Sequence, residues 1–250
     1  MEYNPFTLEN KTILVTGATS GIGRTTAIEC SKFGAHIVIT GRNEERAKET
    51  LSLLEGDGHT YILADLSSRE GIDQLVEDVP VLDGCVNNAG YNIMQLVPYI
   101  KADDMDAIFN VNAEGPIYLV HRLVKKKKLG KGSSIVFTSS ISARGVCSPG
   151  NGLYSATKAA LTAFMRNASL DLAPKHIRCN SVAPGMIETP LKDAKTAITE
   201  EQWEKNRQQY PLGRFGNPED VAFAIIYLLS DASCWVTGTE IVVDGGRSLK

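Results

Sequence analysis

Short apolar runs alternate with helix-length segments along almost the whole sequence. The runs that predict strands cover residues 12–15, 35–40, 60–64, 82–86, 134–139, 178–182 and 240–243. Helices are predicted between them at residues 22–33, 43–54, 68–79, 102–127, 152–172 and 218–229. Strands that alternate with helices join through right-handed crossovers. The pattern therefore predicts an α/β fold with a doubly wound, parallel, seven-stranded sheet.

Two segments depart from this regular alternation. Pro116 lies inside the long predicted helix 102–127 and removes a backbone donor, so we expect a kink near Gly115. Residues 186–211 form a polar insertion with a predicted short helix at 199–209. An insertion of this size is commonly a substrate lid, although a disordered surface loop fits the sequence equally well.

Composition limits the class of protein. A chain of 250 residues with 43% apolar content can bury one large core, so a single domain over residues 1–250 is expected. The net charge of -3 gives no basic field, and neither nucleic acid nor a membrane is expected as a partner. No apolar run reaches the roughly 18 residues of a membrane span, and residues 1–10 lack a signal-peptide pattern. A cytoplasmic location is therefore expected.

Cysteine and histidine residues are scattered along the chain. The cysteines are Cys30, Cys85, Cys147, Cys179 and Cys234, and none of their spacings is typical of a metal site. The four histidines do not cluster either. We expect reduced thiols and no metal.

A glycine-rich turn, Thr16-Gly17-Ala18-Thr19-Ser20-Gly21-Ile22-Gly23, joins the first predicted strand to the first helix. Glycines allow a sharp turn and close approach of the backbone to a pyrophosphate, whose charge is stabilised by free N–H groups at the helix start. This context predicts a dinucleotide-binding site of the Rossmann type.

The end of the second strand indicates which dinucleotide is bound. Sites of this type usually carry an acid there, which accepts the ribose 2′-hydroxyl, whereas this chain has Gly41 followed by Arg42. A guanidinium can bind a 2′-phosphate with paired hydrogen bonds. NADP(H) is therefore the preferred cofactor, with NAD(H) possible. The alternative is that Arg42 only pairs with Glu44 or Glu45.

Tyr154 and Lys158 lie one helical turn apart in the helix 152–172. A nearby ammonium favours the phenolate, so we expect Lys158 to lower the pKa of Tyr154 towards the range useful for proton transfer. Such a pair could protonate a carbonyl oxygen as a hydride arrives. The alternative is that both side chains only share a solvated helix face.

With these motifs assembled, the sequence resembles the short-chain dehydrogenase/reductases, in their single-domain branch. The resemblance extends over nearly the whole length. It rests on the turn Thr16 to Gly23, Asp65-Leu66, Asn87-Asn88-Ala89-Gly90, Asn112, Ser140, Tyr154 with Lys158, Pro184-Gly185, and Val236-Thr237-Gly238 with Asp244-Gly245-Gly246.

The resemblance implies a role for each matching residue. It implies that the catalytic residues are Asn112, Ser140, Tyr154 and Lys158. Ser140 would hydrogen-bond the substrate oxygen, Tyr154 would supply its proton, Lys158 would tune Tyr154 and hold the nicotinamide ribose, and Asn112 would anchor a proton-relaying water. Cofactor contacts are implied for Gly17, Thr19, Ser20, Gly21, Ile22, Gly23, Arg42, Asp65, Leu66, Asn88, Ala89, Gly90, Tyr154, Lys158, Pro184, Gly185, Ile187 and Thr189.

Two of these assignments have structural alternatives. The Ser140 hydroxyl could bond only within its own turn, and Thr138, Ser139 and Ser142 are rival candidates for its role. The Asn112 amide could cap the helix kink before Pro116, which is compatible with a catalytic role.

The substrate is expected to be a small-molecule carbonyl compound or an acyl thioester. Among similar proteins, the 3-oxoacyl-(acyl-carrier-protein) reductases resemble this chain most, and the run Lys125-Lys126-Lys127-Lys128 could attract an acidic carrier. Solvated cations at a helix C-terminus are the preferred reading of that run, and Lys175 stands where carrier-dependent relatives tend to have arginine.

Other readings of function and assembly remain open. Reductases of steroids, sugars, polyols or other small ketones are alternatives, as is a cofactor-binding regulator without catalysis. The relatives are usually tetramers, so a homotetramer is expected. Ala156, Ala159, Ala160, Ala163 and Ala168 would allow close helix contact, although they could equally pack on the sheet.

Overall fold

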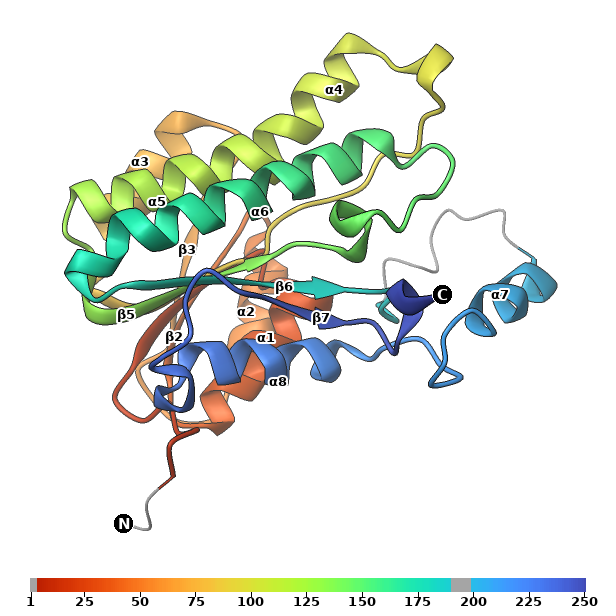
Figure 1. Cartoon of the computed structure of the whole chain (residues 1–250). Coiled ribbons are helices and arrows are strands. Elements are labelled where there is room, and N and C mark those ends of the chain that lie inside the picture. The colour runs from red at the N-terminus through yellow and green to blue at the C-terminus, as the bar shows by residue number, and fades with distance from the viewer. Residues whose placement is uncertain (1–3, 190–198) are drawn as a thin grey trace.

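Seven parallel strands form one sheet at the centre of the molecule (Figure 1). The computed structural model describes residues 4–189 and 199–250. The strands are β1 (Thr12–Thr16), β2 (His36–Gly41), β3 (Thr60–Leu63), β4 (Leu82–Asn87), β5 (Leu129–Thr138), β6 (Arg178–Pro184) and β7 (Glu240–Val243). Their order is β3-β2-β1-β4-β5-β6-β7. Every paired neighbour is parallel, so the predicted doubly wound sheet is confirmed.

Helices cover both faces of this sheet (Figure 1). On one face lie α3 (Arg69–Asp78), α5 (Gly115–Lys125) and α6 (Gly152–Leu172), with α4 (Ala102–Phe109) continuing the line of α5. On the other face lie α1 (Gly21–Lys32) and α8 (Pro218–Leu229), with α2 (Glu44–Leu51) against β2 and β3. Helix α7 (Glu200–Arg207) lies beyond the sheet, at the end to which β6 points.

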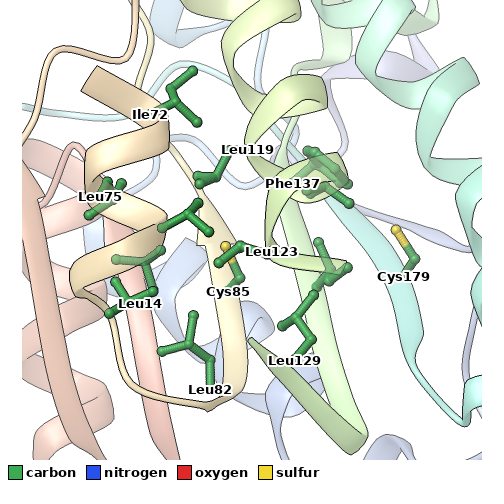
Figure 2. Close-up of a cluster of buried hydrophobic side chains, with 14 of the residues drawn as sticks. Leu14, Ile72, Leu75, Leu82, Cys85, Leu119, Leu123, Leu129, Phe137 and Cys179 are labelled. Carbon is green, nitrogen blue, oxygen red and sulfur yellow. The ribbon is translucent and has the colours of Figure 1, made fainter. Parts of the chain in front are cut away.

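The core consists of two apolar layers because successive strand residues point to opposite faces. Leu14 in β1 belongs to the layer under α3, α5 and α6, whereas its neighbours Ile13 and Val15 belong to the layer under α1 and α8. Figure 2 shows the first layer, which includes Leu119 and Leu123 from α5 and Phe137 from β5. The continuous apolar runs of the sequence thus correspond to strands that are covered on both faces.

The observed strand boundaries differ most from the predicted ones at β5 and β6. β5 begins at Leu129, earlier than predicted, because Leu129 pairs with Leu82 before a register shift leads to the Gly84–Ser134 pair. β6 extends to Pro184 because its end pairs with Val243 of β7. In both cases a neighbouring strand supplies hydrogen bonds that local propensity does not indicate.

The predicted helix 102–127 is interrupted where we expected a kink. A π-helical segment, Asn110–Glu114, separates α4 from α5, and the Gly115 N–H donates to the Asn110 carbonyl five residues earlier. Pro116 has no N–H to donate to the residue four positions before it, which favours the wider turn. Gly115 also lets the helix approach the Leu66 carbonyl oxygen so closely that any side chain would clash.

The polar insertion is described only in part. Its predicted helix is confirmed as α7, which is capped by reciprocal hydrogen bonds between Thr199 and Gln202. Residues 190–198 of the predicted lid lie outside the described residues.

Several other features of the described residues bear on earlier expectations. Three alanines of α6, Ala156, Ala159 and Ala163, are exposed, whereas Ala168 is buried.

No helix within residues 4–189 and 199–250 combines the length and the apolar character that a membrane crossing would need.

The topology of the sheet indicates where a ligand would bind. The chain winds outwards from β1 to β3 and then returns to start β4 beside β1, so the direction of winding changes between β1 and β4. Ligands of such sheets bind in the crevice beyond the carboxyl ends of the strands at this switch point.

Candidate active site

A cavity of about 760 Å³ opens at the carboxyl ends of the strands. Its lining follows the order of the strands across the sheet. Asp65 and Arg42 come after β3 and β2, the glycine turn after β1, and the segment from Asn88 to Asn92 after β4. Ser140 follows β5, Gly185 follows β6 and Arg247 follows β7. The cavity therefore runs past the ends of the strands from β3 to β7, and it could hold an extended ligand with a second molecule beside it.

Two glycines of the turn allow parts of the backbone to pack closely. An ideal Cβ atom at Gly17, where φ is +64°, would lie 2.8 Å from the Cα of Ala89. A Cβ atom at Gly23 would clash with the Gly17 carbonyl and lie 2.5 Å from the Asn88 amide nitrogen. Only glycine at both positions lets the turn after β1 contact the segment after β4.

The start of α1 offers hydrogen-bond donors to an anion. The N-cap residue, Ser20, makes no side-chain hydrogen bond to the helix, and the first turn carries no acid. In α2 and α3, by contrast, Asn43 and Ser68 cap the helix with their side chains. Free N–H groups and the helix dipole at an uncapped N-terminus that lines a cavity fit a phosphate group.

Two arginines lie at the β2 and β3 end of the cavity. Arg42 has no carboxylate within salt-bridge distance in the part of the chain that the structure describes, since Glu44 pairs with Lys48 over 2.8 Å and also accepts from Tyr61. The alternative pairing of Arg42 with Glu44 or Glu45 is therefore not found. Arg46, which the sequence analysis missed, lines the same end.

Gly41 also shapes the β2 and β3 end of the cavity. A Cβ atom at this position would lie 2.6 Å from Thr19 Cγ2, so the space an acidic side chain would need is filled by the glycine turn.

Asp65 is fixed by its own turn. Its Oδ1 atom accepts hydrogen bonds from the Ser67 N–H at 3.0 Å and the Ser67 hydroxyl at 2.8 Å. These bonds, and the more distant charge of Arg42, lower the pKa of the Asp65 carboxyl. Asp65 is thus a fixed anion at the same end of the cavity as Arg42.

Thr16 joins the ends of β1 and β4. Its hydroxyl oxygen accepts from the Asn88 and Ala89 N–H groups at 2.9 and 3.0 Å and donates to the Val86 carbonyl at 3.2 Å. The Asn88 amide oxygen in turn accepts from the Thr138 hydroxyl at 3.3 Å. One hydrogen-bonded network therefore connects the glycine turn to the end of β5.

Lys158 is buried in α6, and its Nζ atom donates to the Thr138 carbonyl oxygen over 2.7 Å. The same atom lies 5.6 Å from the centre of the Tyr154 ring. Burial lowers the pKa of the Lys158 ammonium to about 8. Because both side chains line the cavity, the reading of a merely solvated helix face is not found.

The expected shift of the Tyr154 pKa is not found. Burial raises the pKa of the phenol, and its hydrogen bond with the Ser140 hydroxyl only partly opposes this effect. The lowering expected from Lys158 is absent because the ammonium is directed to the Thr138 carbonyl, while desolvation destabilises the phenolate. Tyr154 is consequently held in its protonated form.

Ser140 faces the cavity beside Tyr154, and of its three rivals Thr138 and Ser142 line the same cavity whereas Ser139 does not. The Ser140 hydroxyl oxygen accepts from the Ser142 hydroxyl at 2.7 Å and from the Ser142 N–H at 3.2 Å. Ser139 is buried and bonds to Thr162 at 2.8 Å, away from the cavity lining. The local turn that we considered as an alternative is thus present, and with both lone pairs engaged the Ser140 hydroxyl donates its proton in the hydrogen bond with Tyr154.

Asn112 lies in the π-helical segment with a fully buried side chain. Its amide accepts from the Tyr91 N–H at 3.0 Å and donates to the Tyr91 carbonyl at 2.7 Å, with a further contact to Thr157 at 3.3 Å. The side chain therefore fixes the backbone after β4. A Cβ atom at Gly90 would lie 3.0 Å from the Asn112 amide oxygen and 3.4 Å from Lys158 Nζ, so these groups are packed together.

Most of the residues singled out from the sequence line this one cavity. They are Gly17, Thr19, Ser20, Gly21, Ile22, Arg42, Asp65, Leu66, Asn88, Ala89, Gly90, Ser140, Tyr154, Lys158, Gly185 and Thr189. Gly23, Asn112, Pro184 and Ile187 lie behind the lining, and the Ile187 side chain belongs to the core.

The sequence analysis missed much of the half of the cavity that surrounds Tyr154. The missed residues there are Tyr91, Asn92, Val111, Ile141, Val146, Ser148, Asn151, Met186, Asn206, Gln209, Tyr210, Phe215 and Arg247. Most come from loops and from α7, where no periodic pattern marks a residue, and Val111 comes from the π-helical segment. Amides and hydroxyls alternate here with apolar side chains such as Val146, Met186 and Phe215.

The lysine run after α5 is engaged with a neighbouring helix. Lys126 forms an ion pair with Glu77 of α3 at 2.6 Å, and Lys128 donates to the Glu77 and Val79 carbonyls. The preferred interpretation is that these are solvated cations at a helix C-terminus, but Lys126 and Lys128 contact the end of α3 instead.

Comparisons with known proteins identify relatives of the chain. A family model described as enoyl-(acyl carrier protein) reductase matches residues 17–248. The 3-oxoacyl-(acyl-carrier-protein) reductase of Rickettsia felis is 36% identical over 240 residues, which cover 96% of this chain and 97% of the relative. The enzyme of the same name from Thermotoga maritima is 36% identical over 247 residues, which cover 96% of this chain and 98% of the relative.

Solved structures agree with these sequence relatives. A structure described as a short chain dehydrogenase/reductase family protein has a TM-score of 0.85 at 31% identity, covering 97% of this chain and 99% of the other. One described as a putative betaketoacyl-ACP reductase has a TM-score of 0.84 at 32% identity, covering 97% of this chain and 100% of the other.

We expect Lys158→Met to flatten the pH dependence of the free energy of unfolding between about pH 8 and 10.5. In this window the unfolded chain binds a proton that folded Lys158, with its pKa lowered from 10.5 to about 8, has lost. Wild-type stability should therefore rise with pH, relative to the variant, by roughly 3 kcal/mol in all. Urea unfolding at a series of pH values measures this difference.

Lys131→Met serves as the control, because Lys131 is exposed at the surface of β5. Its stability should follow the wild type at every pH. Parallel curves for the wild type and Lys158→Met would show that the folded ammonium titrates normally.

Proposed function

Since the chain belongs to the short-chain dehydrogenase/reductase family, we propose that it is an NADP(H)-dependent oxidoreductase that reduces a carbonyl group, with Tyr154 as the proton donor. The observation that carries this proposal is the convergence of Ser140, Tyr154 and Lys158 on one cavity that also contains the glycine turn. A regulator that only binds the cofactor would not need all three side chains.

The residues present fit a dinucleotide with a 2′-phosphate. The uncapped start of α1 would hold the pyrophosphate, and Arg42 with Arg46 would hold the 2′-phosphate, which no acid at position 41 repels. Asn88 to Gly90 would back the adenosine ribose. When bound, the cofactor would supply the hydride that reduces the carbonyl carbon.

Tyr154 would donate a proton to the oxygen that becomes the alcohol. The raised pKa keeps the phenol protonated at neutral pH, and an alkoxide is far more basic, so the transfer is favourable. Ser140 would donate a second hydrogen bond to the same oxygen. Preorganised donors of this kind each contribute roughly 3 kcal/mol to the stabilisation of a developing oxyanion.

Lys158 and Asn112 would support this proton transfer. The Lys158 ammonium, held at the Thr138 carbonyl, would bind the nicotinamide ribose. Asn112 would hold the Tyr91 backbone in place and anchor the water from which the proton is replaced.

The proposed substrate is a 3-oxoacyl thioester. The names of the Rickettsia felis and Thermotoga maritima relatives support this choice. A small polar ketone is the second candidate, because Asn92, Asn151 and Gln209 bring amide groups to the half of the cavity around Tyr154.

Tyr154→Phe should abolish turnover and leave NADPH binding within about twofold of the wild type. The substitution removes the donated proton and keeps the ring packed against its neighbours. Absorbance at the nicotinamide band measures turnover, and the fluorescence of bound NADPH measures affinity. Substantial turnover by the variant would exclude Tyr154 from the chemistry.

Arg42→Ser should raise the Kd of NADPH by about 10- to 100-fold, the range expected when a charge-assisted hydrogen bond is lost, and leave the Kd of NADH unchanged. Fluorescence titration with both nucleotides provides the comparison. Arg166→Ser, which removes an exposed guanidinium from α6, is the matched control. Equal weakening of both nucleotides would mean that Arg42 does not recognise the 2′-phosphate.

A substrate panel separates the two substrate candidates. We expect kcat/KM for an acetoacetyl thioester to exceed that of a 2-enoyl thioester, a steroid ketone and small sugar or polyol ketones by at least about tenfold, a difference of roughly 1.4 kcal/mol. NADPH oxidation measures all of them. A free ketone as the best substrate would overturn the thioester proposal and leave the reaction class intact.

A further inference from the structure

We propose that Arg247 binds an anionic group of the substrate, a carboxylate or a phosphate, at the β7 end of the cavity. This inference rests on the proposed function, in which the cavity around Tyr154 receives a carbonyl compound. It adds to that function a charge requirement for the substrate.

The position of Arg247 follows from the order of the strands. The glycine turn and Arg42 follow β1 and β2, on one side of β5, whereas β6 and β7 lie on its other side. Arg247 follows β7 and still lines the same cavity as Tyr154. Figure 1 shows the C-terminal turn beyond the carboxyl ends of the strands, at the end of the sheet where α7 lies. A dinucleotide that extends from Arg42 to Tyr154 would leave Arg247 for the substrate.

The turn that carries Arg247 is packed in place. Gly245 and Gly246 both have positive φ, and a Cβ atom at Gly246 would lie 2.9 Å from the Pro211 ring. The Arg247 N–H donates to the Asp244 carbonyl at 3.1 Å, and the Leu212 N–H donates to the Gly245 carbonyl at 3.2 Å. The half-buried Arg247 therefore starts from a fixed backbone.

The two acids of β7 and the turn that follows it, Glu240 and Asp244, are already engaged. The Asp244 carboxylate accepts from the Gly246 and Ser248 N–H groups at 2.9 and 2.7 Å. Glu240 pairs with Arg144 at 2.9 Å. Among the side chains that the structure describes, which exclude residues 1–3, 190–198 and 200, no carboxylate forms a salt bridge with the Arg247 guanidinium.

The charges of the lining also favour an anion. Among the described residues that line the cavity, Asp65 is the one acid, and it lies at the opposite end with Arg42 and Arg46. The other lining residues from Met186 onwards, which are Met186, Thr189, Asn206, Gln209, Tyr210 and Phe215, carry no charge. Burial raises the pKa of Tyr210, and the charge of Arg247 is close enough to oppose this shift in part. A guanidinium in such surroundings can bind a carboxylate or phosphate through two parallel hydrogen bonds.

Binding to the NADP⁺-loaded wild-type protein tests this inference without turnover. Two matched pairs of probes distinguish the sources of the anion. Acetoacetate and its ethyl ester represent a small oxo acid, whereas pantetheine 4′-phosphate and pantetheine represent the arm of a carrier-bound thioester. Isothermal titration calorimetry should show that at least one anion binds 10- to 100-fold more tightly than its neutral counterpart.

Three variants assign the effect to Arg247. Arg247→Met should remove the preference for the anion, Arg247→Lys should restore part of it, and Arg166→Met should leave it unchanged. NADPH fluorescence checks that each variant folds. Equal binding of the preferred anion by the wild type and Arg247→Met, or no preference for either anion in the wild type, would overturn the inference.

The result also separates this inference from the proposed function. If an anion binds in an Arg247-dependent way but the wild type with NADPH reduces no carbonyl, the anion site stands and the proposed reductase function is refuted. If neutral carbonyls are reduced with no dependence on Arg247, the reductase function stands and the anion site is refuted.

Discussion

The hydrogen bond from Lys158 to the Thr138 carbonyl places a cation inside the protein, and the surrounding structure is arranged to hold it. A buried ammonium without partners would lose its proton or disrupt the packing. Here the end of β5 supplies the carbonyl, and the Thr138 hydroxyl extends the contact to Asn88. Asn88 is tied to Thr16 at the end of β1. Three strand ends therefore share one polar network, which fixes the ammonium relative to the glycine turn.

The same constraint explains why glycines and the π-helical segment occur where they do. The segment after β4 must pass between the turn after β1 and the Lys158 side chain. Gly17 gives room on one side, and Gly90 gives room beside Lys158 and Asn112 on the other. The π-helical segment brings the Asn112 amide to the Tyr91 backbone. A regular α-helix with Pro116 in its next turn would place residue 112 in a different register and could not make this contact. Close packing of backbone thus sets the geometry of the site.

The parts of this arrangement that could be predicted from the sequence are those with a local signal. Strands with continuous apolar runs, such as 12–15, and the glycine turn were identified because their residue types are restricted by burial and by backbone geometry. The start of β5 was missed because Gly130 and Gly132 have low strand propensity, and only the Leu129–Leu82 pair ahead of them extends the strand to Leu129. The shift of the Tyr154 pKa was predicted with the wrong sign, since spacing reveals the neighbour Lys158 but not the degree of desolvation. Arg46 and Arg247 were missed because only the fold brings them to the cavity.

Charge along the cavity follows from the order of the strands rather than from the order of the chain. Arg42 and Arg46 lie at the end of β2, Lys158 lies beneath the centre, and Arg247 follows β7, so cations are spaced across the sheet with Asp65 as the one acid among the described lining residues. The net charge of the whole chain is -3, and a global average therefore conceals a local positive field. A cleft of this kind attracts anions to both ends at once. In the functions that we propose for them, Arg42 and Arg247 would bind separate anionic groups at the two ends, one on the cofactor and one on the substrate, while the central ammonium stays engaged with Thr138.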